Sequence, residues 1–290
     1  MPIDARPRSP ENRPESGRAT VPIAATAGIF RGERVYPPQN LQGLTHMLQL
    51  KGRTAVVTGG SSGIGAACVT LLRENGAIPV SWDLTGLCDI VCDVSDAKSI
   101  QSAIEKTTAK FGCPSLLVVC AGIILPGTIR TLDVADWDKV FSVNMRGVML
   151  SVQAVARQMI ASETNGSIVL VSSVNGIVAD PGISAYSASK AAVIQFSRVA
   201  AREFGPCGIR INAVAPGPTD TPMLDPLMKR SGYREELIQR SALGAIGTPK
   251  MIAEAVITLM QLEWVTGQTL VVDGGSSLNT GRGNWQAESL

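Results

Sequence analysis

A glycine-rich turn between an apolar strand and a helical segment constrains the fold of this chain more than any other feature. Residues 54–58 (TAVVT) are apolar, residues 58–65 read TGGSSGIG, and residues 64–75 have helical character. Glycines at these places let the backbone come close to a ligand, and the amino end of a helix attracts phosphate. The pattern predicts a turn that binds the pyrophosphate of a dinucleotide. An ordinary tight turn is the alternative.

The rest of the chain alternates between strands and helices. Further strands are expected at residues 78–82, 90–92, 116–120, 167–171, 210–214 and 269–272, and further helices at 137–160, 185–204 and 250–262. This alternation predicts an α/β fold with a doubly wound parallel sheet between two layers of helices, a Rossmann-like architecture. We expect residues 47–290 to form a single domain of this kind.

Residues 1–46 differ from the rest of the sequence. They are rich in Pro, Arg, Glu and Gly and show no sustained hydrophobic period, which predicts a disordered extension. Docking of the apolar residues 21–30 on the body or on a second subunit is the alternative. The extension also lacks the features of a signal or transit peptide.

Composition excludes several classes of protein. The net charge is +2 and aromatic residues make up 4% of the chain, which does not indicate a nucleic-acid surface. The apolar run at 116–125 is about half the length that a membrane span needs. One histidine and six cysteines without a Cys-x-x-Cys pair argue against a metal site and against His-dependent nucleophiles. We expect a cytoplasmic protein with reduced thiols.

Tyr186 and Lys190 form a second motif, in the sequence SAYSASKAAV. A spacing of four residues places both side chains on one face of a helix. An ammonium beside a phenol favours the phenolate and lowers the pKa of the phenol, which would make Tyr186 a proton-transfer group near neutral pH. Packing on a helix face is the alternative for a single tyrosine.

Asp83 ends the second expected strand, 18 residues after Gly65. A carboxylate there can bind the adenosine ribose hydroxyls and repels a 2′-phosphate, and the turn has no Lys or Arg to receive one. The sequence therefore favours NAD over NADP. A role for Asp83 as a strand-end cap is the alternative.

Six motifs in order resemble those of the short-chain dehydrogenase/reductase family, over residues 50–278. They are TGGSSGIG at 58–65, Asp93-Val94, Asn144, Ser173, Tyr186-x-x-x-Lys190 and Pro216-Gly217. The resemblance covers the subgroup that has one Rossmann-like domain, and it implies an oxidoreductase.

The resemblance implies a role for each motif. Tyr186 would be the general acid/base, Lys190 would hold the nicotinamide ribose, Ser173 would bind the substrate oxygen, and Asn144 would keep a water in a proton relay. Asn144 could instead fix a local backbone turn, and Ser172 and Ser173 could be strand-end caps. The resemblance places the cofactor against Gly59, Ser61, Ser62, Gly63, Ile64, Gly65, Asp83, Asp93, Val94, Ala121, Gly122, Tyr186, Lys190, Pro216, Gly217, Thr219 and Thr221.

Two departures from the family pattern are visible. Cys120 stands where the family usually has an asparagine before Ala-Gly. Nine residues separate Asp83 from Asp93, too few for the usual crossover helix, so we expect only a turn there.

The segment 218–246 would be a mobile lid over the substrate by the same resemblance. Its apolar half predicts a hydrophobic alcohol or ketone, and Ile177, Val178 and Ile183 would form the opposite wall. We therefore expect an NAD-dependent dehydrogenase of a secondary alcohol, diol or hydroxysteroid-like substrate. The alternatives are an NADPH-dependent 3-oxoacyl-thioester reductase and a dinucleotide-binding protein without catalysis. The resemblance also implies a homotetramer.

Overall fold

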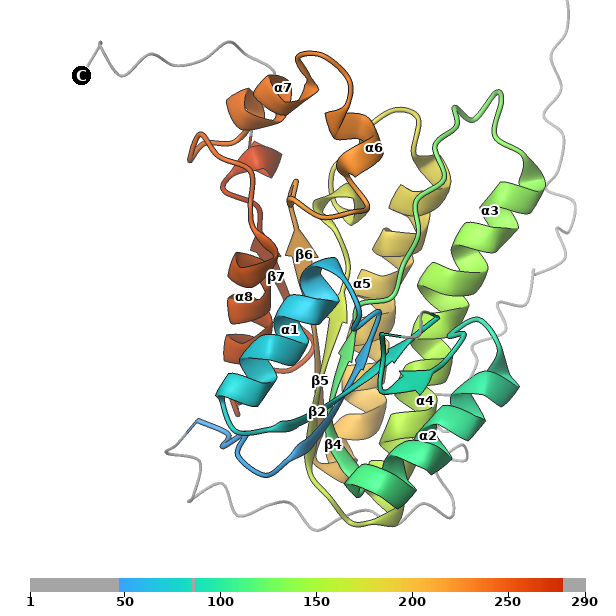
Figure 1. Ribbon diagram of the computed structural model, residues 1–290, viewed down its shortest axis with the longest axis vertical. Helices are drawn as coiled ribbons and strands as arrows, with labels where there is room; N and C mark the ends of the chain where they lie inside the picture. Colours follow the sequence, from blue (N-terminus) through green and yellow to red (C-terminus); the bar gives the residue numbers. More distant parts are fainter. Residues whose placement is uncertain (1–46, 85–86, 279–290) are drawn as a thin grey trace, which may run out of the picture. The chain divides into compact units, whose positions relative to one another are not determined.

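The computed structural model of the chain describes residues 47–84 and 87–278, and its centre is a sheet of seven parallel strands (Figure 1). The spatial order is β3-β2-β1-β4-β5-β6-β7. The strands are β1 Thr54–Thr58, β2 Ile78–Asp83, β3 Ile90–Val91, β4 Pro114–Val119, β5 Gly166–Val171, β6 Ile209–Pro216 and β7 Thr269–Val272.

Helices cover both faces of the sheet (Figure 1). Helices α1 (Gly63–Glu74) and α8 (Pro249–Gln261) pack on one face, and α2 (Ala97–Phe111), α4 (Gly147–Ala161) and α5 (Ser184–Phe204) pack on the other. Every residue of β1, β4 and β5 is buried, because the helices cover these central strands on both sides. The predicted three-layer, doubly wound α/β fold is confirmed.

The strand order changes direction beside β1. This strand pairs with β2 on one side and with β4 on the other, so successive crossovers run to opposite edges of the sheet. In open parallel sheets the crevice outside the carboxyl ends of the strands at such a point is where ligands bind. The glycine turn follows β1 directly, and it therefore lies at that point.

Most elements lie within two residues of the expected positions, and three differences stand out. The expected helix 137–160 begins earlier, with α3 (Val134–Phe141), and contains a π-helical turn, η3 (Ser142–Arg146), before α4. Helix α2, capped by the Asp96 carboxylate, is not among the expected elements. The segment 218–246 carries two short helices, α6 (Asp225–Met228) and α7 (Tyr233–Arg240).

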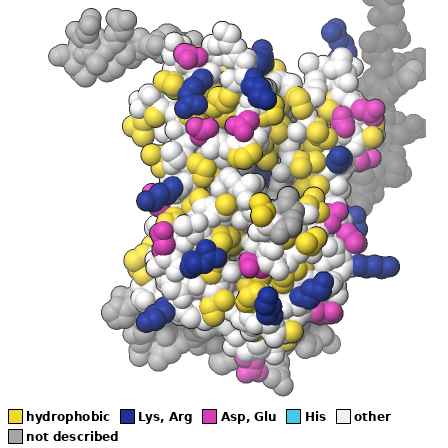
Figure 2. Space-filling view, in the orientation of Figure 1, with side chains coloured by type: hydrophobic (Ala, Val, Ile, Leu, Met, Phe, Trp, Pro, Cys, Tyr) yellow, Lys and Arg dark blue, Asp and Glu magenta, His cyan; other side chains and the backbone are white. Residues whose placement is uncertain are grey.

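Between β2 and β3 the described residues contain no helix, in line with the short spacing from Asp83 to Asp93. No helix among the described residues is long and apolar enough to cross a membrane. Acidic and basic side chains are interspersed over the face shown in Figure 2. The extension predicted to be disordered, residues 1–46, lies outside the described residues, as does the single histidine.

Candidate active site

The glycine turn folds tightly onto itself and onto the end of β4. Gly59 and Gly63 have positive φ angles of 66° and 51°, a conformation that side chains disfavour. A Cβ atom on Gly65 would lie 2.7 Å from the carbonyl carbon of Gly59, and one on Gly59 would lie 2.9 Å from Cα of Ala121. These positions therefore require glycine, and the turn presents bare backbone at the start of α1.

Asp83 links the end of β2 to this turn. Its Oδ2 atom accepts a hydrogen bond from the backbone N–H of Ser61 at 3.0 Å, and its Oδ1 atom accepts one from the N–H of Leu84 at 2.7 Å. The Ser61 hydroxyl is buried and has no hydrogen-bond partner among the described residues. A buried hydroxyl without a partner, beside a turn of bare backbone, fits a site for a polar ligand such as a dinucleotide.

The end of β4 is held against the end of β1. The Thr58 Oγ1 atom accepts hydrogen bonds from the backbone N–H groups of Cys120 at 3.1 Å and Ala121 at 3.2 Å. Burial raises the pKa of the Cys120 thiol to about 11, although the nearby Lys190 ammonium lowers it. The cysteine that replaces the family's asparagine therefore lies close to the Tyr186–Lys190 pair.

Asp93 and Val94 follow β3. The Asp93 Oδ1 atom accepts hydrogen bonds from the N–H and the hydroxyl of Ser95, at 2.8 and 2.7 Å. Val94 is buried against Gly147, where a Cβ atom would lie 2.9 Å from Cγ2 of Val94. The adenine contact expected of Asp93 remains a prediction.

Lys190 is almost fully buried, at 4% exposure. Its Nζ atom donates a hydrogen bond to the carbonyl oxygen of Val171 at 2.9 Å and lies 5.6 Å from the centre of the Tyr186 ring. Burial lowers the pKa of Lys190 to about 8. The two side chains of the predicted motif are therefore neighbours on one helix face, as their spacing indicates.

The pKa of Tyr186 differs from the expectation. Burial raises it, a hydrogen bond with Ser173 lowers it, and the net shift is upward. The net lowering expected from Lys190 is therefore not found, because the loss of solvent around the phenol outweighs the favourable contacts.

The two serines after β5 differ in their contacts. The Ser172 hydroxyl donates to the carbonyl oxygen of Lys190 at 2.8 Å and so joins β5 to α5. The Ser173 oxygen accepts a hydrogen bond from the N–H of Asn175 at 3.1 Å, which caps the 3₁₀ turn η4 (Val174–Gly176). Ser173 is thus a strand-end cap and also a neighbour of the Tyr186 phenol.

Asn144 lies in the π turn and is fully buried. Its carboxamide accepts from the N–H of Ile123 and donates to the carbonyl of Ile123, both at 2.8 Å, and also donates to the Ser189 hydroxyl at 3.1 Å. These contacts match the alternative role, the fixing of a local backbone turn. The water relay remains a prediction.

Residues after β6 reach the glycine turn. A Cβ atom on Gly63 would lie 3.3 Å from the Thr221 methyl group, and one on Gly217 would lie 2.6 Å from Cβ of Asp273. The Thr219 hydroxyl donates to the carbonyl of Gly217 at 2.9 Å. The structure therefore brings together the segments after β1, β4, β5 and β6.

Comparison with known proteins gives the same family as the motifs. A sequence model described as enoyl-(acyl carrier protein) reductase matches residues 59–277. The chain is 37% identical to the 3-oxoacyl-[acyl-carrier-protein] reductase FabG of Thermotoga maritima, over 79% of this chain and 99% of that protein. It is 38% identical to the cis-4-hydroxycyclohexanecarboxylate dehydrogenase of Sinomonas cyclohexanicum, over 77% of this chain and 96% of the relative.

A solved structure adds a spatial match. The crystal structure of a short-chain type dehydrogenase/reductase from Mycobacterium marinum superposes with a TM-score of 0.74 at 27% identity, over 79% of this chain and 96% of that one. The chain belongs to the short-chain dehydrogenase/reductase family.

As a short-chain dehydrogenase/reductase, the protein is an oxidoreductase of CH–OH groups that uses a nicotinamide cofactor. The close-packed glycine turn and the buried Ser61 hydroxyl fit such a cofactor. Among the described residues, no group of three or more His, Cys, Asp or Glu side chains could hold a metal ion.

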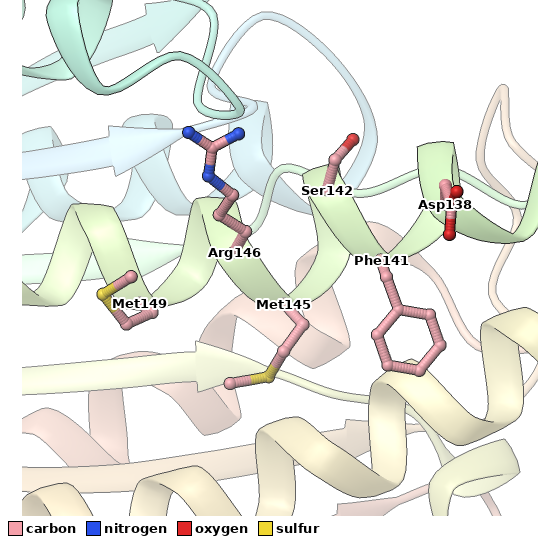
Figure 3. A pocket seen from close by; sticks show the side chains of 6 residues that line it. All are labelled: Asp138, Phe141, Ser142, Met145, Arg146 and Met149. Carbon is pink, nitrogen blue, oxygen red and sulfur yellow. The ribbon is translucent and has the colours of Figure 1, made fainter. Parts of the chain in front are cut away.

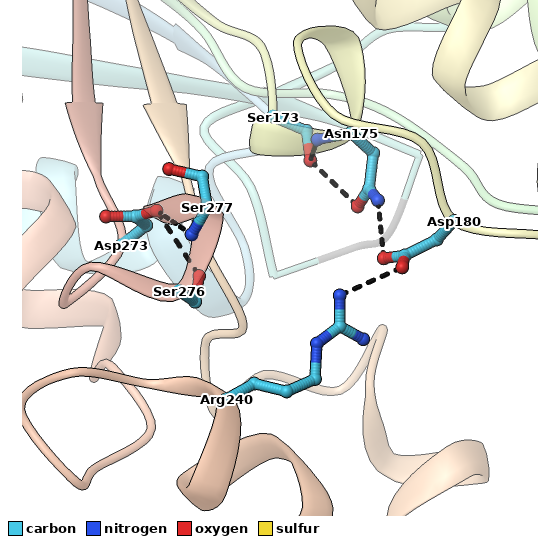
Figure 4. Close-up of polar contacts among 7 residues, drawn as sticks. All are labelled: Ser173, Asn175, Asp180, Arg240, Asp273, Ser276 and Ser277. Carbon is cyan, nitrogen blue, oxygen red and sulfur yellow. Dashed lines mark hydrogen bonds and ion pairs between the residues drawn. The ribbon is translucent and has the colours of Figure 1, made fainter. Parts of the chain in front are cut away.

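Other features of this family member were not singled out from the sequence. A polar chain runs from Ser173 through Asn175 and Asp180 to Arg240 on α7 (Figure 4). Its members are up to 67 positions apart, so local patterns do not reveal it. A separate apolar hollow lies on α3, η3 and α4, lined by Asp138, Phe141, Ser142, Met145, Arg146 and Met149 (Figure 3).

Proposed function

We propose that the protein is an NAD-dependent dehydrogenase that oxidises a secondary alcohol, diol or hydroxysteroid-like substrate to a ketone. The observation that carries the choice of NAD is the Asp83 carboxylate, hydrogen-bonded to the N–H of Ser61 at 3.0 Å beside a turn without basic residues. A 2′-phosphate next to this carboxylate would meet like charge without a compensating cation.

The roles proposed for the chain's residues follow from their contacts. A nicotinamide cofactor bound here would supply the acceptor for the hydride of the substrate carbon. Tyr186 takes the hydroxyl proton, and Ser173, which hydrogen-bonds Tyr186, holds the substrate oxygen. Lys190 holds the nicotinamide ribose and is anchored by the Val171 carbonyl. Asn144 maintains the backbone at Ile123 that borders the site.

Cofactor contacts are proposed for the turns that meet at the carboxyl edge of the sheet. Gly59 and Gly65 supply the close backbone approach for the pyrophosphate, and Asp83 the ribose contact. The remaining members of this proposed set are Ser61, Ser62, Gly63, Ile64, Asp93, Val94, Ala121, Gly122, Pro216, Gly217, Thr219 and Thr221.

The substrate is proposed to be largely apolar. Ile177 is 53% exposed in the segment between Ser173 and Tyr186, and Met223 is 42% exposed in the segment after β6. Exposed apolar side chains from both proposed walls favour a hydrophobic alcohol or ketone.

An NADPH-dependent 3-oxoacyl-thioester reductase is the second candidate. It is favoured by the 37% identity to the 3-oxoacyl-[acyl-carrier-protein] reductase of Thermotoga maritima. The two candidates differ in the nucleotide that they prefer, since the reductase needs a site that accepts the 2′-phosphate.

We also propose a cytoplasmic homotetramer, built through α3–α4 and through β7. In the hollow of Figure 3, Phe141 and Met145 lie between Asp138 and Arg146, and an antiparallel second copy would pair each of these charges with its opposite. Leu270 and Val271, each 40% exposed, lie on the edge strand of the sheet. Cys68, Cys92, Cys113 and Cys120 are free thiols, which suits a reducing compartment.

The test is nicotinamide absorbance during incubation with a panel of secondary alcohols, diols, hydroxysteroids and 3-hydroxyacyl thioesters, with NAD and NADP in parallel. Turnover with NAD is expected, at a rate reduced by at least about 10²-fold in Tyr186→Phe, which should still bind NADH. Asp83→Ala should lose the preference for NAD. Turnover of the thioesters with NADP alone would favour the second candidate, and no turnover with intact NADH binding would indicate a non-catalytic protein.

A further inference from the structure

Each hydrogen bond of the polar chain that ends at Arg240 has a donor and an acceptor that can be assigned (Figure 4). Arg240 only donates, and it donates to Asp180 Oδ1 at 2.9 Å. Asp180 only accepts while ionised, so the group that faces its Oδ2 atom at 2.8 Å must be the Asn175 NH₂. The Asn175 carboxamide oxygen is thereby turned toward Ser173, whose hydroxyl lies 3.3 Å away.

This assignment of donors and acceptors determines where the single hydrogen of the Ser173 hydroxyl goes. The hydroxyl donates to the Asn175 oxygen, while the Ser173 oxygen accepts from the backbone N–H of Asn175 at 3.1 Å. Ser173 also hydrogen-bonds Tyr186, and because this contact lowers the pKa of Tyr186, it is one in which Ser173 donates to the phenolate. Asn175 therefore holds the Ser173 hydroxyl in place with two hydrogen bonds, and its carboxamide oxygen competes with the Tyr186 phenolate for the single Ser173 hydrogen.

The far end of the chain is fixed to the body of the protein. The residues after Arg240 are bonded to the turn after β7, with the Ser241 hydroxyl and the Leu243 N–H both donating to the Gly274 carbonyl, at 3.1 and 3.0 Å. Arg240 is thus the anchored end of α7. It reaches Asp180 from a stable position.

The turn after β7 is itself ordered around Asp273. This carboxylate accepts from the N–H of Gly275 at 2.8 Å and of Ser277 at 2.7 Å (Figure 4). It also packs against Gly217, a proposed cofactor contact. The turn at Asp273 therefore supports both Gly217, on the cofactor side of the site, and the residues that follow Arg240.

We propose that Asn175, Asp180 and Arg240 are positioning residues for the Ser173 hydroxyl, which they direct through the carboxamide of Asn175. The inference rests on the proposed function, in which Ser173 holds the substrate oxygen. The same ion pair joins the segment between Ser173 and Tyr186 to helix α7, so the two proposed walls of the substrate site keep a fixed relation on this side.

Helix α7 offers a matched control. Arg234, on the same helix, forms an ion pair with Asp220 at 3.5 Å, and both side chains are about half exposed, at 50% and 49%. Asp220 follows β6 and lies outside the Ser173–Asp180 segment, so this pair is not part of the polar chain. Arg234→Gln therefore removes a lid charge and an ion pair without altering the direction of the Ser173 hydroxyl.

The experiment compares kcat, KM and NADH affinity in the full-length protein, using the panel alcohol that the wild type oxidises fastest. We expect Arg240→Gln and Asn175→Ala to lower kcat about tenfold with unchanged NADH affinity, because a Ser173 hydroxyl that is no longer held in place should cost less than the 10²- to 10³-fold of deleting a hydrogen-bond donor. Arg240→Lys should recover most of the rate, and Arg234→Gln should lower the rate less than Arg240→Gln does.

A second readout separates orientation from general support of the loop. Asn175→Ala frees the Ser173 hydrogen for the phenolate of Tyr186, so the midpoint of the pH profile of kcat should move to lower pH. An unmoved midpoint, or equal rates for Arg240→Gln and Arg234→Gln, would overturn the positioning role. A wild type without activity on the whole panel would instead refute the proposed function, and the positioning role with it.

Discussion

Replacing Gly65 by alanine tests the closeness of the glycine turn directly. The added Cβ atom would lie 2.7 Å from the Gly59 carbonyl carbon and 3.2 Å from Cα of Gly60. Both neighbours are backbone atoms and cannot rotate away. Gly65 belongs to α1 and its φ is not positive, so alanine brings no backbone strain of its own and the effect is steric.

The size of the effect follows from two opposing contributions. Overpacking costs about 1–3 kcal/mol, and contact with fixed backbone favours the upper end. Alanine in place of glycine inside a helix returns about 1 kcal/mol. We therefore expect Gly65→Ala to lower the free energy of unfolding by about 2 kcal/mol, the difference between these two contributions.

The cofactor site should change together with stability. Opening the turn moves the amides at the start of α1, and each 1.4 kcal/mol lost in binding raises Kd tenfold, so we expect NADH affinity to fall by about tenfold or more. Urea unfolding followed by circular dichroism gives the stability, and NADH fluorescence gives the affinity.

Gly205 provides the control for this substitution. It has helical φ and ψ angles of −53° and −47°, and an added Cβ atom would have nothing within 4 Å apart from its two chain neighbours. Pro206 follows it and disfavours helical angles in a residue that has a Cβ atom, which offsets the gain of about 0.4–1 kcal/mol that alanine brings through the unfolded chain, so Gly205→Ala should be close to neutral. A Gly65→Ala protein as stable as the Gly205→Ala control, with unchanged NADH affinity, would refute the steric argument.

Two further predictions concern buried titratable groups. Burial raises the pKa of Cys120 to about 11, so iodoacetamide should leave this thiol unmodified at pH 8 and react only as the pH approaches that value; rapid labelling at pH 8, seen by mass spectrometry, would contradict it. Burial lowers the pKa of Lys190 from 10.5 to about 8, so between these values the unfolded chain binds more protons than the folded one. Wild-type stability should therefore rise relative to Lys190→Met from pH 8 to pH 10.5 in urea unfolding, and a constant difference would argue against the buried ammonium.

Local features of the sequence were enough to predict the architecture. The strand and helix positions follow from short apolar runs and their periods, which depend on neighbouring residues alone. The glycine turn after β1 and the four-residue spacing of Tyr186 and Lys190 are local in the same sense. The lack of a helix among the described residues between β2 and β3 follows from a count of residues.

The proposed roles of individual site residues depended on more than local order. The sequence left open whether Asn144 keeps a water or fixes a turn, and its hydrogen bonds to Ile123 depend on a π turn that helical periodicity does not indicate. Helix α2 was also missed, although Asp96 supplies a capping carboxylate at its start.

What the sequence determined by itself is therefore the order of elements, the layered fold and the family, because each of these is written in short-range patterns. Only the tertiary structure decided the direction of the Tyr186 pKa shift, since the loss of solvent depends on every segment that packs around the phenol. It also decided that Arg240 meets Asp180, 60 positions away, because the fold brings the end of α7 to the segment after β5.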